Sequence, residues 1–131
     1  MSAASGDKVF VVLDIDNDSN KAEKVISLIK ENKNEAISFI VSNPVFEIWF
    51  LLHYRFTTKF YADVDAVIKD LKKYIPNYEK NFDSYELCKD KLSVALENVN
   101  KLTQRYEGVN WPSKDCNPRI DVANLIRIIT G

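Results

Sequence analysis

Three aspartates at alternate positions, Asp14, Asp16 and Asp18, end an apolar run that begins at Val9. Side chains two residues apart in a strand point to the same side, so the spacing predicts three carboxylates on one side of the backbone. Like charges this close repel one another unless a cation lies among them. Because Mg²⁺ and Mn²⁺ prefer oxygen ligands, the stretch predicts a site for one of these ions at the end of a buried strand.

The same aspartates also have a structural interpretation. Aspartate after a strand is a common turn and helix-capping residue, and Asp18 with Ser19 directly precedes a helical pattern. Two familiar motifs with similar acids do not fit. An EF-hand loop would continue with a glycine and a later glutamate, where this chain has Ser19 and Val25. A phosphatase of the haloacid-dehalogenase type would have threonine or valine in place of Asp18.

A second informative stretch begins at Asn43. Asn43 and Pro44 are favourable first residues of a helix, and the residues that follow are apolar on every side except at Glu47. A carboxylate buried in such a helix is costly unless it is paired or bound to a metal. Asn43 and Glu47 are four residues apart, so they would share a helix face directed towards the strand ends. Glu47 is predicted to act with Asp14 in catalysis, or else to be structural and satisfied by an arginine or a backbone cap.

Three residues are candidates for contacts with a substrate phosphate, namely Asn43, His53 and Arg119. His53 is the only histidine and ends the same helical segment, where the helix dipole also gives it a structural interpretation. Arg119 lies in the first turn of a predicted closing helix that Asn117 would cap. A cation at that position opposes the helix dipole, which indicates an anionic partner such as a carboxylate or a phosphate.

The composition is typical of one soluble globular domain. The chain has 131 residues, of which 46% are apolar and 28% are charged, and its net charge of −1 excludes a strongly basic protein. Cys88 and Cys116 form no CxxC pair and are typical of reduced thiols. The longest apolar run, residues 48–52, is too short to cross a bilayer, and the sequence shows no signal peptide. We therefore expect a cytoplasmic protein without membrane association.

Hydrophobic periodicity predicts an α/β fold that positions these residues. The strand that leads to the aspartates, an amphipathic helix over residues 21–31 and a second buried strand over residues 35–41 form a βαβ unit with parallel strands. Two more amphipathic helices, over residues 63–74 and 85–106, are predicted to form a hairpin. The expected fold is a small parallel sheet with a helical hairpin insertion, over about residues 60–106, and a C-terminal helix.

The chain is predicted to form a single domain over residues 8–131 after a disordered leader, residues 1–7. Two strands are too few for an independently stable sheet, and an unpaired apolar edge is a template for another chain. We therefore expect a homo-oligomer that covers this edge, with a short extra strand over residues 105–111 as the second choice.

The order of these stretches resembles the RloB-like family. Its members share a hydrophobic strand that ends in spaced acids, a helix with the pattern NPxFExWxLLH, a helical insertion and a final helix that begins with NP. The corresponding sequences here are VVLDIDND, NPVFEIWFLLH at residues 43–53 and NPRIDVANLI at residues 117–126. The resemblance covers nearly the whole chain.

The resemblance implies a Toprim-like domain, the metal-dependent fold of topoisomerases, primases and OLD-type nucleases. In that fold a later DxD pair binds Mg²⁺, and Asp14 and Asp16 match this pair. The fold also has a catalytic glutamate on a first βα unit, which would precede the acid strand. We therefore expect a C-terminal piece or a truncated relative, in which Glu47 is the remaining buried acid. Family members occur beside ATPase genes in bacterial phage-defence and abortive-infection loci, and cleavage of nucleic acid is implied for some relatives.

Two functions follow from these expectations. The first is a Mg²⁺-dependent or Mn²⁺-dependent nuclease domain with nucleic acid as its substrate, impaired by the missing glutamate. The second is a non-catalytic interaction module that docks a partner ATPase.

Overall fold

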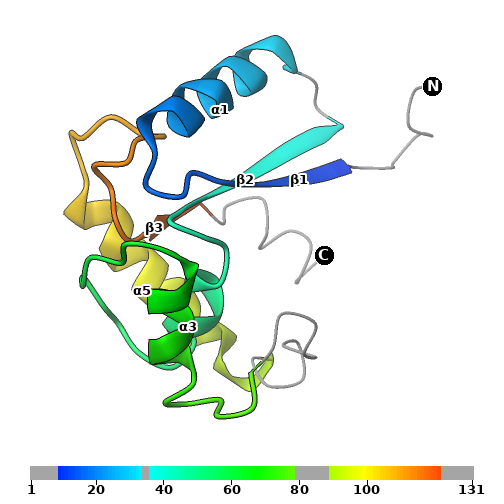
Figure 1. Cartoon of the computed structure of the whole chain (residues 1–131). Helices are drawn as coiled ribbons and strands as arrows, with labels where there is room; N and C mark the ends of the chain where they lie inside the picture. Colours follow the sequence, from blue (N-terminus) through cyan, green and yellow to red (C-terminus); the bar gives the residue numbers. More distant parts are fainter. Residues whose placement is uncertain (1–8, 34–35, 79–88, 122–131) are drawn as a thin grey trace.

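The structure, a computed structural model, describes residues 9–33, 36–78 and 89–121. A mixed sheet lies at its centre (Figure 1). Its strand order is β1-β2-β3, with bounds Val9–Asp14, Ile37–Asn43 and Arg119–Ile120. β1 and β2 are parallel, whereas β3 is antiparallel to β2. The expected α/β class is confirmed.

Helix α1, Ser19–Glu31, connects β1 to β2 and completes the predicted βαβ unit. The helix begins earlier than predicted because Asp18 caps it by accepting hydrogen bonds from two backbone amides of the first turn. Its apolar side packs on one face of the sheet, where it forms a small core. The buried members of this core are Ile15, Ala22, Val25 and Val41.

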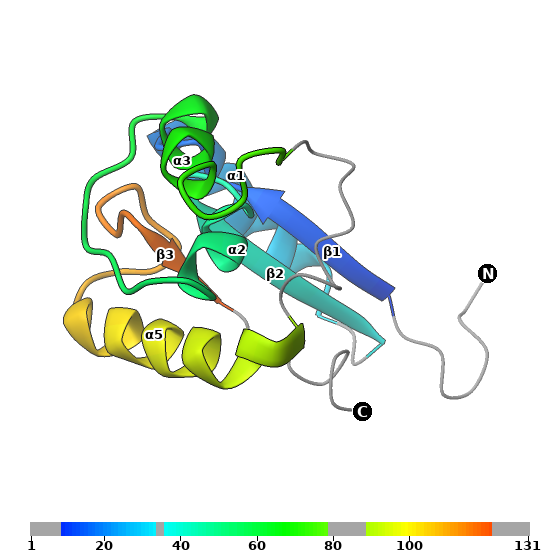
Figure 2. The same ribbon diagram turned by 90° about the horizontal axis from the view of Figure 1, so that it is seen from below.

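The remaining helices lie on the other side of the sheet (Figure 1). They are α2, Ile48–Leu52, α3, Val64–Leu71, the 3-10 helix η1, Lys89–Lys91, and α5, Leu92–Arg105. Of these, α2 and α5 contact β3. α2 is buried and packs against both α3 and α5, and it lies between them in Figure 2. The two helices expected to form a hairpin, α3 and α5, therefore pack on either side of α2. The surface of α2 is apolar on every side and needs both helices to bury it. In the described part of the chain, no helix is long and apolar enough to cross a bilayer.

The predicted helix start at Pro44 is wrong. Asn43 is the last residue of β2, residues 44–47 form a turn, and α2 begins at Ile48. Asn43 does not cap a helix because its backbone pairs with Arg119 of β3 and its side chain is hydrogen-bonded to two distant loops.

The predicted start of a C-terminal helix at Pro118 is also wrong. Arg119 and Ile120 form β3, and the amide of Asp121 donates to the carbonyl of Val41. The open edge of β2 has backbone groups that need partners, and β3 supplies them while Ile120 enters the core. The remainder of that predicted helix, residues 122–131, lies outside the described residues, as do the leader and residues 85–88.

The extra strand predicted over residues 105–111 is not present. Arg105 ends α5, and a turn follows it. The third strand comes from β3 instead, and it pairs only with the C-terminal end of β2. β1 is an edge strand in the described sheet, so the homo-oligomer stays a prediction.

Candidate functional site

The acid loop, residues 14–18, connects β1 to α1 and carries all three aspartates. Strand geometry ends at Asp14, because Asp16 and Asn17 have φ values of 54° and 57°. Aspartate and asparagine tolerate this left-handed conformation better than other non-glycine residues. The backbone therefore turns, and the predicted arrangement of three carboxylates on one side of an extended strand is wrong.

Asp14 is held in place by two hydrogen bonds on the side of the sheet that carries α2. Its Oδ1 accepts from Ser42 Oγ at 2.9 Å and from the backbone amide of Phe46 at 3.0 Å. Hydrogen bonds to an ionised carboxylate are stronger than those between neutral groups. Glu47 follows Phe46 in sequence and is only 9% exposed. The structure therefore brings the segment that carries Glu47 next to Asp14.

Lys21 supplies a positive charge to the acid loop. Its ammonium forms an ion pair with Asp16. The hydrogen bond and the charge of Asp16 raise the pKa of Lys21, and the charges of Asp18 and Asp14 act in the same direction. Sequence analysis missed this residue because it looks like an exposed helix lysine. Its position in the first turn after a run of acids was the available signal.

Asn43 fixes the acid loop from the end of β2. Its Oδ1 accepts from the amide of Asn17 at 2.8 Å, while its Nδ2 donates to the carbonyls of Lys114 at 3.2 Å and Cys116 at 2.9 Å. Asn43 is fully buried. One side chain thus joins the acid loop to the loop that precedes β3.

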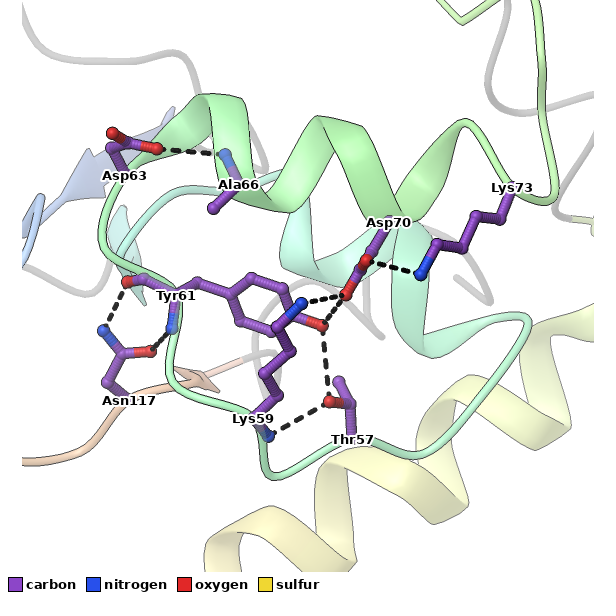
Figure 3. A network of polar contacts seen from close by, with 8 residues as sticks. All are labelled: Thr57, Lys59, Tyr61, Asp63, Ala66, Asp70, Lys73 and Asn117. Atoms are coloured by element: carbon purple, nitrogen blue, oxygen red, sulfur yellow. Dashed lines mark hydrogen bonds and ion pairs between the residues drawn. The ribbon is translucent and has the colours of Figure 1, made fainter.

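Asn117 makes a second connection. Its Oδ1 accepts from the Tyr61 amide at 3.0 Å, and its Nδ2 donates to the Tyr61 carbonyl at 2.8 Å (Figure 3). The same Nδ2 lies 3.4 Å from Oδ1 of Asn17. Asn117 was predicted to cap a helix, and it instead ties the segment before α3 to the acid loop. No local sequence pattern indicated this role.

His53 lies in the core between the helices. It is 3% exposed, its Nδ1 lies 2.7 Å from the carbonyl oxygen of Trp49, and its ring meets the Trp49 ring edge to face at 4.6 Å. Burial lowers the pKa of His53, which favours the neutral imidazole. These contacts match the structural interpretation of this histidine.

Arg119 lies opposite Asn43 in the β2–β3 ladder. Its neighbour Ile120 packs with α2, so alternation directs Arg119 to the face that carries α1. Asp14 pairs in register with Ser42 and hydrogen-bonds to it, on the α2 face. The side chains of Arg119 and Asp14 therefore project from opposite faces of the sheet, although both residues lie at strand ends.

The acid loop is the predicted site of a divalent ion. Among the described residues, no group of three or more His, Cys, Asp or Glu side chains is placed to hold a metal ion. Mg²⁺ commonly keeps several waters and uses only one or two carboxylates. Asp14 and Asp16 are the predicted pair for such an ion, and the ammonium of Lys21 lies against Asp16.

Comparison with known proteins places the chain in a family. Neither the curated proteins nor the solved structures gave a significant match. The family model described as RloB-like protein matches residues 1–129, which is nearly the whole chain. The protein therefore belongs to the RloB-like family.

Proposed function

We propose that the chain is a Mg²⁺-dependent or Mn²⁺-dependent domain that cleaves phosphodiester bonds, within a Toprim-like RloB protein of phage defence. The observation that carries the proposal is the acid loop at the carboxyl end of β1, where Asp16 is paired with a cation, the ammonium of Lys21. Ligands of open α/β sheets bind beyond the carboxyl ends of the strands. The match to the RloB-like family supports the assignment of Asp14 and Asp16 as the DxD pair.

In this proposal each residue has one task. Asp14 and Asp16 hold the ion, and Asp18 contributes charge while it caps α1. A bound divalent ion supplies electrostatic stabilisation to the oxygens of the phosphate in the transition state. Glu47, which follows the residue whose amide donates to Asp14, is the group that takes and returns a proton.

The phosphate contact is assigned to Arg119 among the three candidates. The side-chain hydrogen bonds of Asn43 and the ring contacts of His53 are made within the protein. A guanidinium binds phosphate with two parallel hydrogen bonds. Asn43 therefore acts by holding the acid loop, and His53 acts by packing.

Titration with Mn²⁺ should raise the melting temperature, because a ligand that binds only the native state stabilises it. At a metal concentration 100 times the Kd the gain is about 2.7 kcal/mol. The shift should vanish in the variant with both Asp14→Asn and Asp16→Asn, together with Mn²⁺-dependent cleavage of a single-stranded oligonucleotide. Asp65→Asn, an exposed acid of α3, is the matched control and should keep both. A parent protein without a metal shift would contradict the proposal.

Lys21→Met should strengthen Mn²⁺ binding several-fold. The ammonium of Lys21 and a metal ion compete for the carboxylate of Asp16, so removal of the ammonium favours the metal. Isothermal titration of wild type and variant measures the change. Lys24→Met, an exposed lysine on the next turn of α1, is the control and should leave the affinity unchanged. Weaker binding in Lys21→Met would show that the lysine assists the metal.

One observation favours the second candidate, a non-catalytic module that docks a partner ATPase or a second copy. Val9 and Val12 of the edge strand β1 are each 49% exposed. Exposed apolar strand edges pair with other chains. A protein that shows neither a metal shift nor cleavage, and that forms a stable complex through β1, would establish this function instead.

A further inference from the structure

A groove of about 750 Å³ lies at the C-terminal end of α5, beside β3. It is formed by the last turn of α5, by the chain that follows and by β3. Its lining combines two aromatic rings, two side-chain amides and two charges of opposite sign. These belong to Gln104, Tyr106, Glu107, Asn110, Trp111 and Arg119.

Arg119 is the cation of this groove, and its hydrogen-bonding capacity is not filled by the described residues. Its guanidinium carbon lies 4.7 Å from the centre of the Trp111 ring. Its Nη1 has only a long contact of 3.9 Å with Sγ of Cys116, and its buried Nε has no hydrogen-bond acceptor among the described residues. The guanidinium of Arg119 therefore has hydrogen-bonding capacity left for an anion in the groove that it lines.

We infer that this groove binds one nucleotide of a single-stranded nucleic acid. The phosphate would contact Arg119, and the base would lie against the parts of the Trp111 and Tyr106 rings that line the groove. Stacking on aromatic rings is the usual mode of single-strand binding, and side-chain amides such as Gln104 and Asn110 hydrogen-bond base edges. The volume is within the range of small-molecule sites. An acidic peptide fits less well because it would use Arg119 but not the aromatic rings, on which a base can stack.

The groove is joined to the acid loop through two asparagines. Arg119 pairs with Asn43 across the β2–β3 ladder, and Asn43 accepts from the amide of Asn17 in the acid loop. Asn117, two residues before Arg119, contacts the side chain of Asn17. Only β2 separates β1 from β3, so their backbones are about 10 Å apart. A single-stranded nucleic acid with one nucleotide in the groove would place a neighbouring phosphate near the acid loop.

This inference deepens the proposed function by naming single-stranded nucleic acid as the substrate. Only this assignment of a substrate rests on the proposed function. Nucleotide binding in the groove itself needs no metal. The site can therefore be tested with EDTA present, so its failure is distinguishable from failure of the metal site.

Fluorescence titration tests the groove directly, because Trp49 is buried in the core and Trp111 lines the groove. The probes are adenosine monophosphate, a short single-stranded oligoadenylate and the same strand in a duplex. We expect quenching by the first two, and much weaker binding of the duplex because its bases are already stacked. Arg119→Met should weaken single-strand binding about tenfold or more, since a charge-assisted hydrogen bond is lost. Arg119→Lys, which keeps the charge but not the fork, should weaken it less.

Arg105→Met is the matched control. Arg105 also lies over an aromatic ring, 5.9 Å from the centre of Tyr106, but it does not line the groove. Its loss should change the affinity less than threefold. The inference is overturned if neither probe quenches Trp111, if the duplex binds as tightly as the single strand, or if Arg119→Met and Arg105→Met behave alike. Binding of polyglutamate in place of nucleotide, with the same dependence on Arg119, would also overturn it. The Mn²⁺-induced shift in melting temperature should be the same in Arg119→Met as in the wild type. The loss of nucleotide binding would then not be due to damage at the metal site.

Discussion

Asn43→Ala should lower the free energy of unfolding by about 3 kcal/mol, because three backbone groups, of which the carbonyl of Cys116 is buried, lose their partner. These are the amide of Asn17 and the carbonyls of Lys114 and Cys116. Urea denaturation at neutral pH measures the loss. The Mn²⁺-induced shift should also decrease, since the acid loop loses its attachment to β2.

Asn32→Ala is the matched control for this prediction. Asn32 Nδ2 donates one hydrogen bond to the carbonyl of Leu28 at the exposed end of α1, so its loss should cost less than about 1 kcal/mol. Asn43→Asp keeps an acceptor for Asn17 but buries a carboxylate against two carbonyl oxygens, so its cost should be at least as large as that of Asn43→Ala. Equal costs for Asn43→Ala and Asn32→Ala would contradict the role assigned to Asn43.

Asp70→Ala should lower the free energy of unfolding by about 2 kcal/mol at neutral pH, since the buried Tyr61 hydroxyl loses its acceptor. Asp70 is 2% exposed, and its Oδ2 accepts from Tyr61 at 2.8 Å and from Lys59 at 3.3 Å (Figure 3). Lys73 lies 3.1 Å from its Oδ1. The two lysines are exposed and remain hydrated after the substitution. The loss of free energy of unfolding is therefore smaller than the loss on breaking a fully buried ion pair.

The cost of Asp70→Ala should depend on pH in a definite direction. Burial by itself would raise the pKa of Asp70, but hydrogen bonds from Tyr61, Lys73 and Lys59 lower it from 3.8 to about 2. A carboxyl group with a lowered pKa stabilises the native state above its unfolded value, and this contribution is lost as the pH falls through the folded value. The difference between wild type and variant should therefore be constant above about pH 4 and shrink towards pH 2.

Denaturation curves of both proteins across this pH range test the prediction. Tyr61→Phe removes one of the hydrogen bonds that lower the pKa of Asp70, so the pH at which stability is lost should move upwards. Asp65→Ala, on the exposed side of the same helix, is the control and should cost much less than Asp70→Ala at neutral pH. A pH-independent cost of Asp70→Ala would contradict the assignment.

The sequence by itself determined the elements that local pattern controls. The apolar run before Asp14, the amphipathic period of α1 and the buried second strand gave the βαβ unit and its parallel pairing. Asp18 capped α1, as its alternative interpretation predicted. The burial of Glu47 followed from its apolar neighbours. These features depend on side-chain period and on nearest neighbours, which are visible in a single sequence.

Only the tertiary structure decided how the asparagines are used. Asn43 and Asn117 each precede proline, a local pattern typical of a helix start, and both were predicted to cap helices. In the fold, each is hydrogen-bonded to a segment far away in sequence. Such partners cannot be inferred from the spacing of residues in the sequence. The edge of β2 with which β3 pairs exists only after the sheet has formed.

The same reason explains the candidate site. The sequence supplied the aspartates, but alternation failed at Asp16, where the chain adopts a left-handed turn. Lys21 joined the acids because that turn brings the first turn of α1 back towards them. Residue types were therefore set by the sequence. Their distances, and the face of the sheet on which Asp14 and Arg119 lie, were set by long-range backbone pairing, which no local pattern encodes.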